Sequence, residues 1–547
     1  MPETNLSFES RRSPVFGRGG MVAASQPLAV AAGLKILASG GSAADAAVAV
    51  AAALNVTEPT STGLGGDAFA LYYEASTRQV YALNGSGGAP AALTLERLER
   101  EGLSRRLPAF HPYTVTVPGA CAAWCDLVER FGSLPLADIL APARRLAEEG
   151  FPVASITAYF WDLGARRQLR EAVNGQELTI DGRAPRAGEI FRNPGLVRTF
   201  DQIARGGKRA FYDGPIAESL SAVVQEAGGC LMQADLTAHE SKWEQPISVR
   251  YRDLRIWECP PNGQGIAALL ALNLLEGFDL AALGPLSPQR LHLEIEAMRL
   301  AFADAFHYVA DPAFSAAPLS SLLSREYASS RRAFIDPRRA NPHIQHGVPM
   351  ASSDTVYFSV VDGQGNACSF INSNYMGFGT GIVPRGWGFS LQNRGHNFSL
   401  DPQHPNALAP SKRPYHTIIP ALATRAADDS LFASFGVMGG FMQPQGHMQV
   451  AVAMADDQLD PQAALDRPRF CVEADGGELH AAPVALEEGI PVHVMAALAE
   501  MGHQVRPVSG MGRTLFGRGQ IICRDPQTGV VWGGSDPRAD GCAMCLD

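Results

Sequence analysis

The stretch "SSDTVYFSVVDGQGNACSF", residues 352–370, decides the fold of this chain. Its residues follow a period of two from Thr355, pass through the turn-forming run Asp362-Gly363-Gln364-Gly365-Asn366, and resume the same period afterwards. This pattern predicts a β-hairpin. Thr355 then stands at the head of the first strand, and the pattern alone makes it an ordinary strand residue.

The segments on either side of this hairpin differ in character. Residues 312–353 are polar and irregular, which is typical of a domain boundary or an exposed linker. Downstream, further strands are predicted within 416–425, 431–439 and 519–525, and a helix within 445–457. The hairpin therefore opens a strand-rich second part of the chain.

The first part is predicted to be richer in helix. Residues 27–38 and 42–54 form two alanine-rich helical stretches, which Gly40-Gly41 interrupts and of which Ser42 caps the second. A glycine loop then leads into two strands with a turn near Ser76-Thr77. Apolar residues at helical spacing predict further helices within 118–150 and 286–311. A helix layer followed by a sheet layer is expected.

Composition limits the class of protein. The 547 residues are 46% hydrophobic and 18% charged, and no run approaches the roughly 18 apolar residues of a membrane helix. A net charge of −10 disfavours nucleic acid as the main partner. The first twenty residues lack an apolar run behind their arginines, so a cytoplasmic protein is expected. Nine scattered cysteines suggest reduced thiols, and Cys542 and Cys545 are interpreted as part of a flexible C-terminus.

Several short motifs carry little weight. The elbow GxSxG of serine hydrolases is absent, and "GFGTG" at 377–381 reads as a tight turn rather than as half of a dinucleotide site. His343 and His346 have HxxH spacing without a nearby acidic partner. His416 and His447 are lone histidines, typical of hydrogen-bonded structural residues. No metal and no cofactor are therefore expected.

A resemblance changes the interpretation of Thr355. The segments "MVAASQPLAVAAGLKILASGGSAADAAVAVAAALNVTEP", "GLGGDAFALYY", "DTVYFSVVDGQGNA", "LAPSKRPYHTIIPA", "GVMGG" and "GGSDPRADG" resemble the γ-glutamyltransferase family, in order, from about Met21 to about Gly541. The resemblance implies the α+β N-terminal-nucleophile hydrolase fold, a four-layer αββα sandwich. It also implies self-cleavage between Asp354 and Thr355, which would yield a heterodimer of a large chain, 1–354, and a small chain, 355–547. Further dimerisation is left open.

Cleavage before a threonine makes chemical sense. A threonine hydroxyl needs a base close by, and a new N-terminus supplies an α-amino group of pKa about 7.7 to 8.0 in the same residue. By resemblance, the backbone amides of Gly439 and Gly440 would stabilise the oxyanion, and the Ser373 hydroxyl would assist Thr355. The expected reaction is amide hydrolysis through an acyl-Thr355 ester.

The sequence departs from the family where the glutamyl group would bind. Positions that usually hold an arginine, two serines and an aspartate fall on Ser86, His416, Thr417 and Asn397. Two positions that usually hold asparagine and glutamine fall on Tyr375 and Arg394. Loss of the aspartate and gain of an arginine favour an acid substrate without an α-amino group, gripped by Arg394 with help from His416. A structural salt bridge of Arg394 is the alternative.

The preferred interpretation is a self-processing amidohydrolase close to the branch that includes oxamate amidohydrolase, acting on a small carboxylate-bearing amide. A γ-glutamyltransferase or glutathione hydrolase with a rebuilt pocket is the first alternative. The second is an acylase like the cephalosporin acylases, or a binding protein that never cleaves. Tyr357 gives the last some weight, since the family commonly has histidine there.

Overall fold

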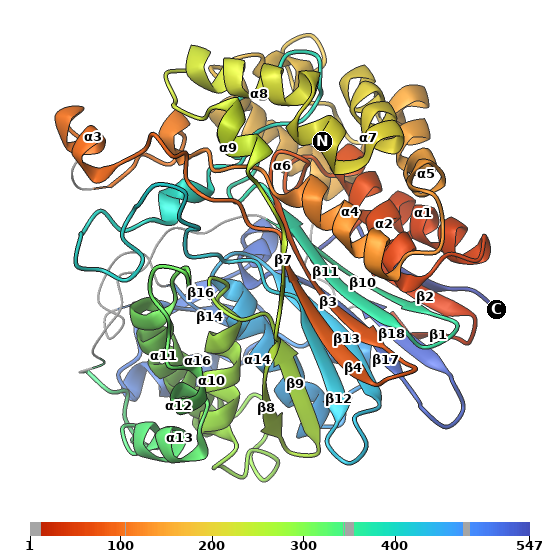
Figure 1. Cartoon of the computed structure of the whole chain (residues 1–547). Helices are drawn as coiled ribbons and strands as arrows, with labels where there is room; N and C mark the ends of the chain where they lie inside the picture. Colours follow the sequence, from red (N-terminus) through yellow and green to blue (C-terminus); the bar gives the residue numbers. More distant parts are fainter. Residues whose placement is uncertain (1–11, 104–105, 343, 345–354, 474–481) are drawn as a thin grey trace.

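The computed structural model describes residues 12–103, 106–342, 344, 355–473 and 482–547. Two seven-stranded sheets, each antiparallel throughout, form the centre of the molecule (Figure 1). The first sheet has the order β1 (Val15–Gly17), β18 (Val531–Ser535), β17 (Arg518–Arg524), β13 (Leu431–Met438), β12 (Ala421–Arg425), β9 (Leu254–Glu258) and β8 (Ile247–Tyr251). The second has the order β19 (Cys542–Cys545), β2 (Gly20–Ala24), β10 (Val356–Asp362), β11 (Ala367–Ser373), β3 (Asp67–Glu74), β4 (Gln79–Asn84) and β7 (Lys242–Glu244).

Helices cover the outer face of each sheet, which completes the αββα sandwich (Figure 1). Those in the layer on the second sheet are α1 (Pro27–Ala38), α2 (Ala43–Thr57), α4 (Ala120–Phe131), α5 (Leu136–Glu149), α6 (Ser155–Gly164), α7 (Pro194–Tyr212) and α8 (Pro215–Glu226). Those in the layer on the first sheet are α10 (Gly265–Leu275), α11 (Pro288–Tyr308), α14 (Met442–Ala455), α15 (Pro461–Asp466) and α16 (Val492–Glu500).

The remaining elements are short. Three helices, α3 (Leu95–Arg100), α9 (Gln233–Thr237) and the π-helical turn η2 (Ala165–Leu169), lie in the first half of the chain. The 3-10 turns are η1 (Pro112–Thr114), η3 (Gly175–Leu178), η4 (Arg394–Asn397) and η6 (Gly510–Phe516). A small sheet contains β14 (Phe470–Val472), β15 (Val484–Glu487) and β16 (Val505–Val508), and β5 (Phe151–Pro152) pairs with β6 (Ile190–Phe191).

The predicted hairpin is confirmed, and its strands face two environments. Val356, Phe358 and Val360 of β10 pack under the helices, whereas Tyr357 and Val361 point between the sheets. This alternation is why the strand has almost no charge: both of its faces are buried. The turn forms because the Asp362 carboxylate accepts hydrogen bonds from the backbone N–H groups that follow it.

Tyr357 belongs to the layer between the sheets. Its hydroxyl lies 2.6 Å from Ser359 Oγ and 2.8 Å from Ser369 Oγ, and Ser359 Oγ lies 2.9 Å from Ser434 Oγ of the opposite sheet. The ring occupies space that opens because residue 436 is glycine, where an added Cβ would come within 2.5 Å of it. The Tyr357 hydroxyl therefore belongs to a group of hydroxyls that connects the two sheets through Ser359 and Ser434.

The alanine-rich helices follow the expected capping. Ser42 and Asp45 cap α2 reciprocally: Ser42 Oγ accepts from Asp45 N at 3.2 Å, and the Asp45 carboxylate accepts from Ser42 N at 2.9 Å. Every residue of α2 is buried, which its small side chains permit by close approach of neighbouring elements. The Asp362 carboxylate also accepts from Ala43 N at 3.0 Å, which ties the hairpin turn to the start of α2.

Two expectations are corrected. Cys542 and Cys545 do not lie in a flexible tail: they bound β19, which pairs with β2 and buries Ala543 in the apolar layer between the sheets. The polar segment 312–353 is not irregular throughout, since it contains α12 (Leu319–Leu322) and α13 (Arg325–Arg332). Their few apolar residues, such as Leu322 and Ala328, are buried, so the segment packs on the core where it is described.

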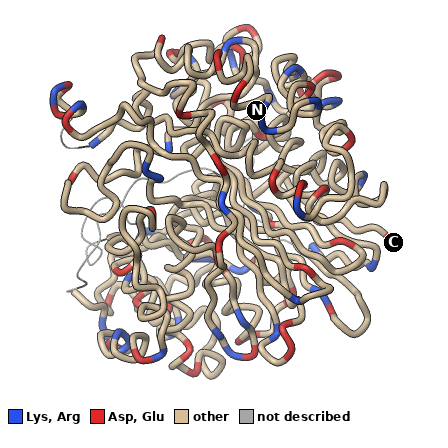
Figure 2. Tube along the Cα trace, in the orientation of Figure 1, with Lys and Arg blue, Asp and Glu red and all other residues tan. Residues whose placement is uncertain are grey.

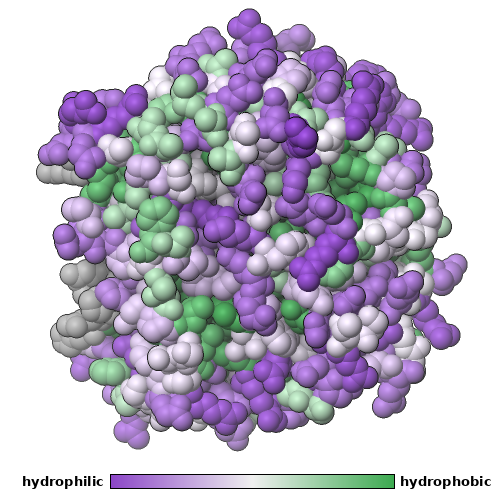
Figure 3. Space-filling model, in the orientation of Figure 1, coloured by the Kyte–Doolittle hydropathy of each residue, from purple (hydrophilic) through white to green (hydrophobic). Residues whose placement is uncertain are grey.

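The surface is mixed in character. Figure 2 shows acidic and basic residues interspersed over the helices and loops of one face, and Figure 3 shows that hydrophilic residues cover most of that face with smaller apolar areas between them. Among the described residues, no helix combines the length and the apolar character needed to cross a membrane.

Candidate functional site

The Thr355 hydroxyl lies beside that of Ser373. Thr355 directly precedes β10 and is fully buried, and Ser373 ends the neighbouring strand β11. Antiparallel pairing of Val356 with Asn372 brings the two side chains together, so that Thr355 Oγ1 donates to Ser373 Oγ at 3.2 Å. Asp354, the other side of the predicted cleavage site, lies outside the described residues.

Arg394 reaches the same hydroxyl from η4. One terminal nitrogen of its guanidinium donates to Ser373 Oγ at 3.2 Å and the other to Thr417 Oγ1 at 2.7 Å. The guanidinium carbon lies 4.4 Å from the centroid of the Tyr375 ring. Four residues that were predicted separately from the sequence thus lie together around Thr355: Ser373, Tyr375, Arg394 and Thr417.

The charge of Arg394 is poorly compensated. The side chain is fully buried, and within the described residues it forms no ion pair and its Nε has no hydrogen-bond partner. Burial lowers the pKa of the guanidinium to about 10, against an opposing effect of the nearby Asp67 carboxylate. Arg394 remains cationic at neutral pH, and a buried cation of this kind is a strong site for an anion.

Asp67 and His416 form a buried pair next to this cluster. Asp67 heads β3, where its Oδ1 accepts from the backbone N–H groups of Gly87 and Gly119 and from Gln392 Nε2. His416 Nε2 lies 2.9 Å from Asp67 Oδ2, and Ile418 N donates to His416 Nδ1. The neutral imidazole therefore carries its proton on Nε2 and donates a hydrogen bond to Asp67 Oδ2.

The protonation of this pair follows from its burial. Burial raises the pKa of Asp67 to about 7, although Arg394 and the hydrogen bonds from its partners oppose the rise. Burial also holds the pKa of His416 well below its usual value, with Arg394 acting in the same direction. His416 is neutral, and both of its ring nitrogens already have partners, so it supports the loop that carries Thr417.

Gly439 and Gly440 form the turn between β13 and α14. Their φ angles of +132° and +59° lie in the region that favours glycine. The turn is fixed from both sides, since Met442 N donates to Gly439 O at 3.0 Å and Gln264 Nε2 donates to Gly440 O at 2.8 Å. Such a turn can present backbone N–H groups to a ligand at the start of a helix.

Ser86 and Asn397 lie further out. Ser86 Oγ donates to Asn84 Oδ1 at 2.7 Å and accepts from Asn262 Nδ2 at 3.2 Å, so its partners are these two asparagines. Asn397 Nδ2 donates to Tyr415 O at 3.1 Å, while its buried Oδ1 has no partner among the described residues. Asn397 is therefore an available acceptor, and Ser86 is already hydrogen-bonded within its own group.

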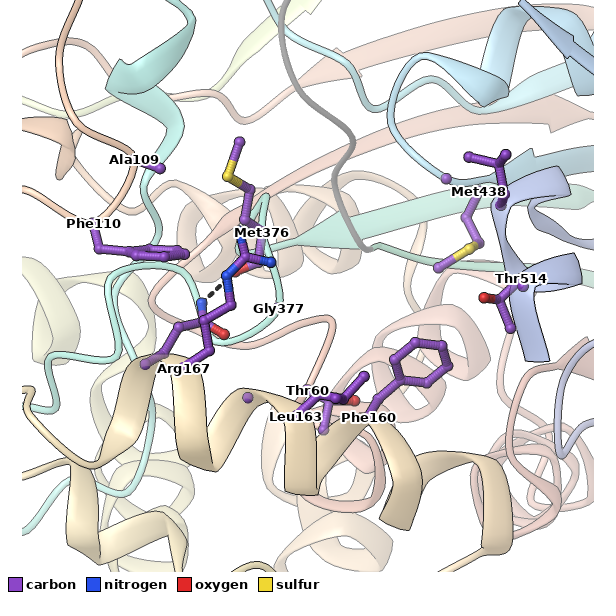
Figure 4. Close-up of a pocket in the computed structure, with 15 residues that line it drawn as sticks. Thr60, Ala109, Phe110, Phe160, Leu163, Arg167, Met376, Gly377, Met438 and Thr514 are labelled. Atoms are coloured by element: carbon purple, nitrogen blue, oxygen red, sulfur yellow. Dashed lines mark hydrogen bonds between the residues drawn. The ribbon is translucent and has the colours of Figure 1, made fainter. Parts of the chain in front are cut away.

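A cavity of about 400 Å³ adjoins the candidate centre (Figure 4). Gly439 lines one part of it, and Met376 and Gly377, which follow Tyr375, line another. Most of the other lining side chains are apolar or aromatic, and Arg167 is the one charged residue among them: Thr60, Ala109, Phe110, Phe160, Leu163, Gly164, Arg167, Gln168, Met438, Gly512, Thr514 and Leu515. The cavity therefore lies beside the buried centre, and it is large enough for a bulky substrate.

Sequence reasoning missed Asp67 and the cavity residues. An aspartate between Gly66 and the apolar strand "AFALYY" was a usable signal, because a carboxylate at the head of a fully buried strand needs several partners. No comparable signal marked Arg167 or Phe110, which come from the helical turn η2 and from a distant turn and meet only in the fold. Among the described residues no group of His, Cys, Asp and Glu could hold a metal ion, and His343 and His346 lie outside those residues.

Comparison with known proteins identifies close relatives. The gamma-glutamyltranspeptidase family model matches residues 29–546. The chain is 35% identical to the glutathione hydrolase-like YwrD proenzyme of Bacillus subtilis over 97% of this chain and 99% of that one. It is 33% identical to the oxamate amidohydrolase proenzyme of Klebsiella pneumoniae over 96% and 98%. The crystal structure of cephalosporin acylase from Bacillus halodurans is 46% identical, with a TM-score of 0.89 over 99% and 98% of the two chains.

Proposed function

Because the chain belongs to the γ-glutamyltranspeptidase family and is an N-terminal-nucleophile amidohydrolase, we propose that it hydrolyses the amide of a small carboxylate-bearing acid such as oxamate. The relative from Klebsiella pneumoniae supports this substrate class by its name. Thr355, exposed as a new N-terminus by cleavage after Asp354, is the proposed nucleophile.

The observation that carries the proposal is the state of Arg394. It is a buried cation that points at the Ser373 hydroxyl beside Thr355 and has no carboxylate partner among the described residues. A substrate carboxylate would supply the missing charge and could accept from Nε and a terminal nitrogen together. In oxamate the carboxylate is bonded directly to the amide carbon, so a carboxylate on Arg394 would hold that carbon close to Thr355.

The proposed reaction proceeds in two steps. The free α-amino group of Thr355 takes the proton of its own hydroxyl, whose oxygen bonds to the amide carbon. The oxyanion accepts hydrogen bonds from the amides of Gly439 and Gly440, and the C–N bond breaks as the leaving nitrogen takes the proton. Water then hydrolyses the Thr355 ester by the same path, which releases the acid and restores the hydroxyl.

A second candidate is hydrolysis of γ-glutamyl amides. The relative from Bacillus subtilis is named glutathione hydrolase-like, and the buried Asn397 Oδ1 without a described partner could accept from a substrate α-ammonium group. An amide oxygen carries no full charge, however, and compensates an ammonium less than the aspartate that the family usually has there. The acid without an ammonium is therefore the better match.

Two substrates separate the candidates. Purified, cleaved protein is incubated with oxamate and with γ-glutamyl-4-nitroanilide, and release of ammonia and of nitroaniline is followed. The proposal predicts ammonia from oxamate and at least about a hundredfold lower kcat/KM for the anilide, since one missing charge partner in a buried site costs about 3 kcal/mol. Rapid nitroaniline release without ammonia would establish the second candidate instead.

A further inference from the structure

The geometry points to a second anion-binding position at Arg167, which selects amides whose leaving amine carries an aromatic ring with a carboxylate. This inference rests on the proposed function for the acyl half of the substrate and adds the chemistry of the amine half. It assigns a substrate-binding role to a residue outside the group formed by Thr355, Ser373, Arg394 and Thr417.

Arg167 is an available cation. It lies on η2, directly after α6, and its side chain is exposed. Its guanidinium carbon lies 5.3 Å from the centroid of the Phe110 ring, and within the described residues it forms no ion pair. The neighbouring Arg166 is different, because it pairs with Asp162 one turn earlier and does not line the cavity. Arg167 is held over an aromatic ring with its charge free for a ligand.

The cavity is too large and too apolar for a two-carbon acid amide alone. Its volume of about 400 Å³ falls within the range of about 300 to 1,000 Å³ that suits drug-sized ligands. Six side chains give it an apolar or aromatic lining: Phe110, Phe160, Leu163, Met376, Met438 and Leu515. A ring would bury apolar surface here that a free ammonia leaving group cannot.

The order of bond breaking places the leaving amine on the side of the centre that faces the cavity. The acyl group stays on Thr355 after the first step, next to the buried Arg394, while the amine must leave before water can attack. The amine therefore needs the open side of the centre, and the exposed Leu163 and Arg167 show that the cavity is open. Figure 4 shows Phe110 and Arg167 on the opposite side of the cavity from Met438, the neighbour of Gly439.

These placements define the leaving amine. Its nitrogen lies near Gly439, its ring between the apolar side chains, and its carboxylate at the far end against Arg167. A planar guanidinium can donate two parallel hydrogen bonds to a carboxylate, and the Phe110 ring beneath keeps it oriented. An aminobenzoate is the simplest amine with this shape.

Three substrates and two variants test the inference. The values of kcat/KM are measured for oxamate, N-phenyloxamate and N-(4-carboxyphenyl)oxamate with the wild type, Arg167→Ala and the matched control Arg166→Ala. Arg167→Ala is expected to lower the value for the carboxyphenyl substrate roughly fivefold, the size of a partly exposed charge pair. The other two substrates should be unchanged, and Arg166→Ala should change none. Comparing variants on one substrate cancels any effect of the ring carboxylate on the leaving group itself.

The inference is overturned if Arg167→Ala lowers kcat/KM for all three substrates alike, which would be a structural effect. It is also overturned if Arg167→Ala leaves kcat/KM for the carboxyphenyl substrate unchanged. Failure of the proposed function is a separate result. If no oxamate is hydrolysed but γ-glutamyl anilides are, the same comparison is made on γ-glutamyl anilide with and without a ring carboxylate. The dependence on Arg167 then decides the inference even though the acyl group was misassigned.

Discussion

At the scale of single residues, the Ser373 hydroxyl oxygen is the acceptor that several groups of the site share. It receives hydrogen bonds from Thr355 Oγ1, from an Arg394 nitrogen and from the backbone N–H of Tyr375. A cation that contacts the hydroxyl beside the proposed nucleophile can both hold a substrate and stabilise negative charge on it. Substitutions at Thr355 and Arg394 should therefore have different effects.

Thr355→Ala is expected to leave the chain uncleaved and inactive, because it removes the hydroxyl that cleavage and turnover share. Thr355→Ser keeps a hydroxyl and should cleave more slowly. Intact mass after prolonged incubation measures both. Thr199→Ala, which alters a buried threonine hydrogen-bonded on α7, is the control and should cleave normally. Cleavage of Thr355→Ala before residue 355 would contradict the assignment of the nucleophile.

Arg394→Lys is expected to raise KM for oxamate by about ten- to a hundredfold, since one charge-assisted hydrogen bond is worth about 1.5 to 3 kcal/mol and lysine lacks the planar fork. Steady-state kinetics with cleaved protein gives the value. Arg425→Lys, a half-buried arginine on β12 that donates to Leu431 O, serves as the control. A fall in kcat at unchanged KM would show that Arg394 orients Ser373 and does not bind the carboxylate.

At the scale of elements, the turn from β13 into α14 carries the two backbone amides that are proposed to stabilise the oxyanion. A Cβ on Gly439 would lie 3.2 Å from Gly517 Cα and 3.3 Å from Met442 Cβ, and the φ of +132° is unfavourable for alanine. The turn therefore depends on glycine for its shape, and its N–H groups have little freedom to move.

Gly439→Ala is expected to lower kcat by about a hundredfold or more, because the added Cβ strains the turn and displaces its N–H groups, and loss of one oxyanion hydrogen bond costs about 2.7 to 4 kcal/mol. The kcat for oxamate is compared with that of Gly529→Ala, which places alanine at φ +72° in a turn between β17 and β18. The control also places alanine at a positive φ but lies away from the site. Equal losses of kcat in both variants would indicate a general effect of strain.

Helix α14 is anchored by His447, whose Nδ1 lies 2.7 Å from Glu258 Oε1 on β9. Burial lowers the pKa of His447 to about 3, from 6.5. Below pH 6.5 the unfolded chain takes up a proton at His447 that the folded chain does not, so the contribution of His447 to the free energy of unfolding falls as the pH falls. Between pH 8 and pH 5 this amounts to about 2 kcal/mol. Burial raises the pKa of Glu258, whose contribution has the opposite sign, so the effect of His447 has to be measured against a variant that keeps Glu258.

Urea unfolding in the Thr355→Ala background, which keeps a single chain, measures this dependence. His447→Gln removes the titrating group. Between pH 8 and pH 5 its free energy of unfolding should therefore fall by about 2 kcal/mol less than that of the Thr355→Ala parent. Parallel pH profiles of the two proteins would mean that His447 is protonated in the folded state.

The sequence predicted elements better than contacts. The hairpin, the helix pair capped at Ser42 and the strands around Leu422, Phe435 and Ile522 followed from periodicity and turn residues, because each of these signals is local. The strand β19 was missed, since four residues with two cysteines carry no clear period. The Asp67–His416 pair was missed because its members are 349 residues apart and meet only through the stacking of strands and loops.

At the scale of the whole molecule, the two predicted chains are interleaved. Five antiparallel strand pairs join residues before the cleavage site to residues after it: β2 with β10, β2 with β19, β3 with β11, β9 with β12, and β1 with β18. Both sheets, and the apolar layer between them, contain strands from both chains. Cutting the peptide bond leaves all of these contacts in place.

The cleaved protein is therefore expected to elute at the same volume as uncleaved Thr355→Ala in size-exclusion chromatography, and to separate into two chains only in denaturant. Buried sheet pairing of this extent resembles a domain core rather than a transient interface. Two native peaks after cleavage would refute this arrangement.

The position of β19 has a consequence for the time at which the protein can mature. Strand β19 pairs with β2, which in turn pairs with the strand that begins after Thr355. The face of β10 that points between the sheets also packs against β13 and β17, which are among the later parts to be synthesised. The surroundings of Thr355 are therefore complete only once β13, β17 and β19 have been synthesised, and we expect the proposed self-cleavage to wait for these strands.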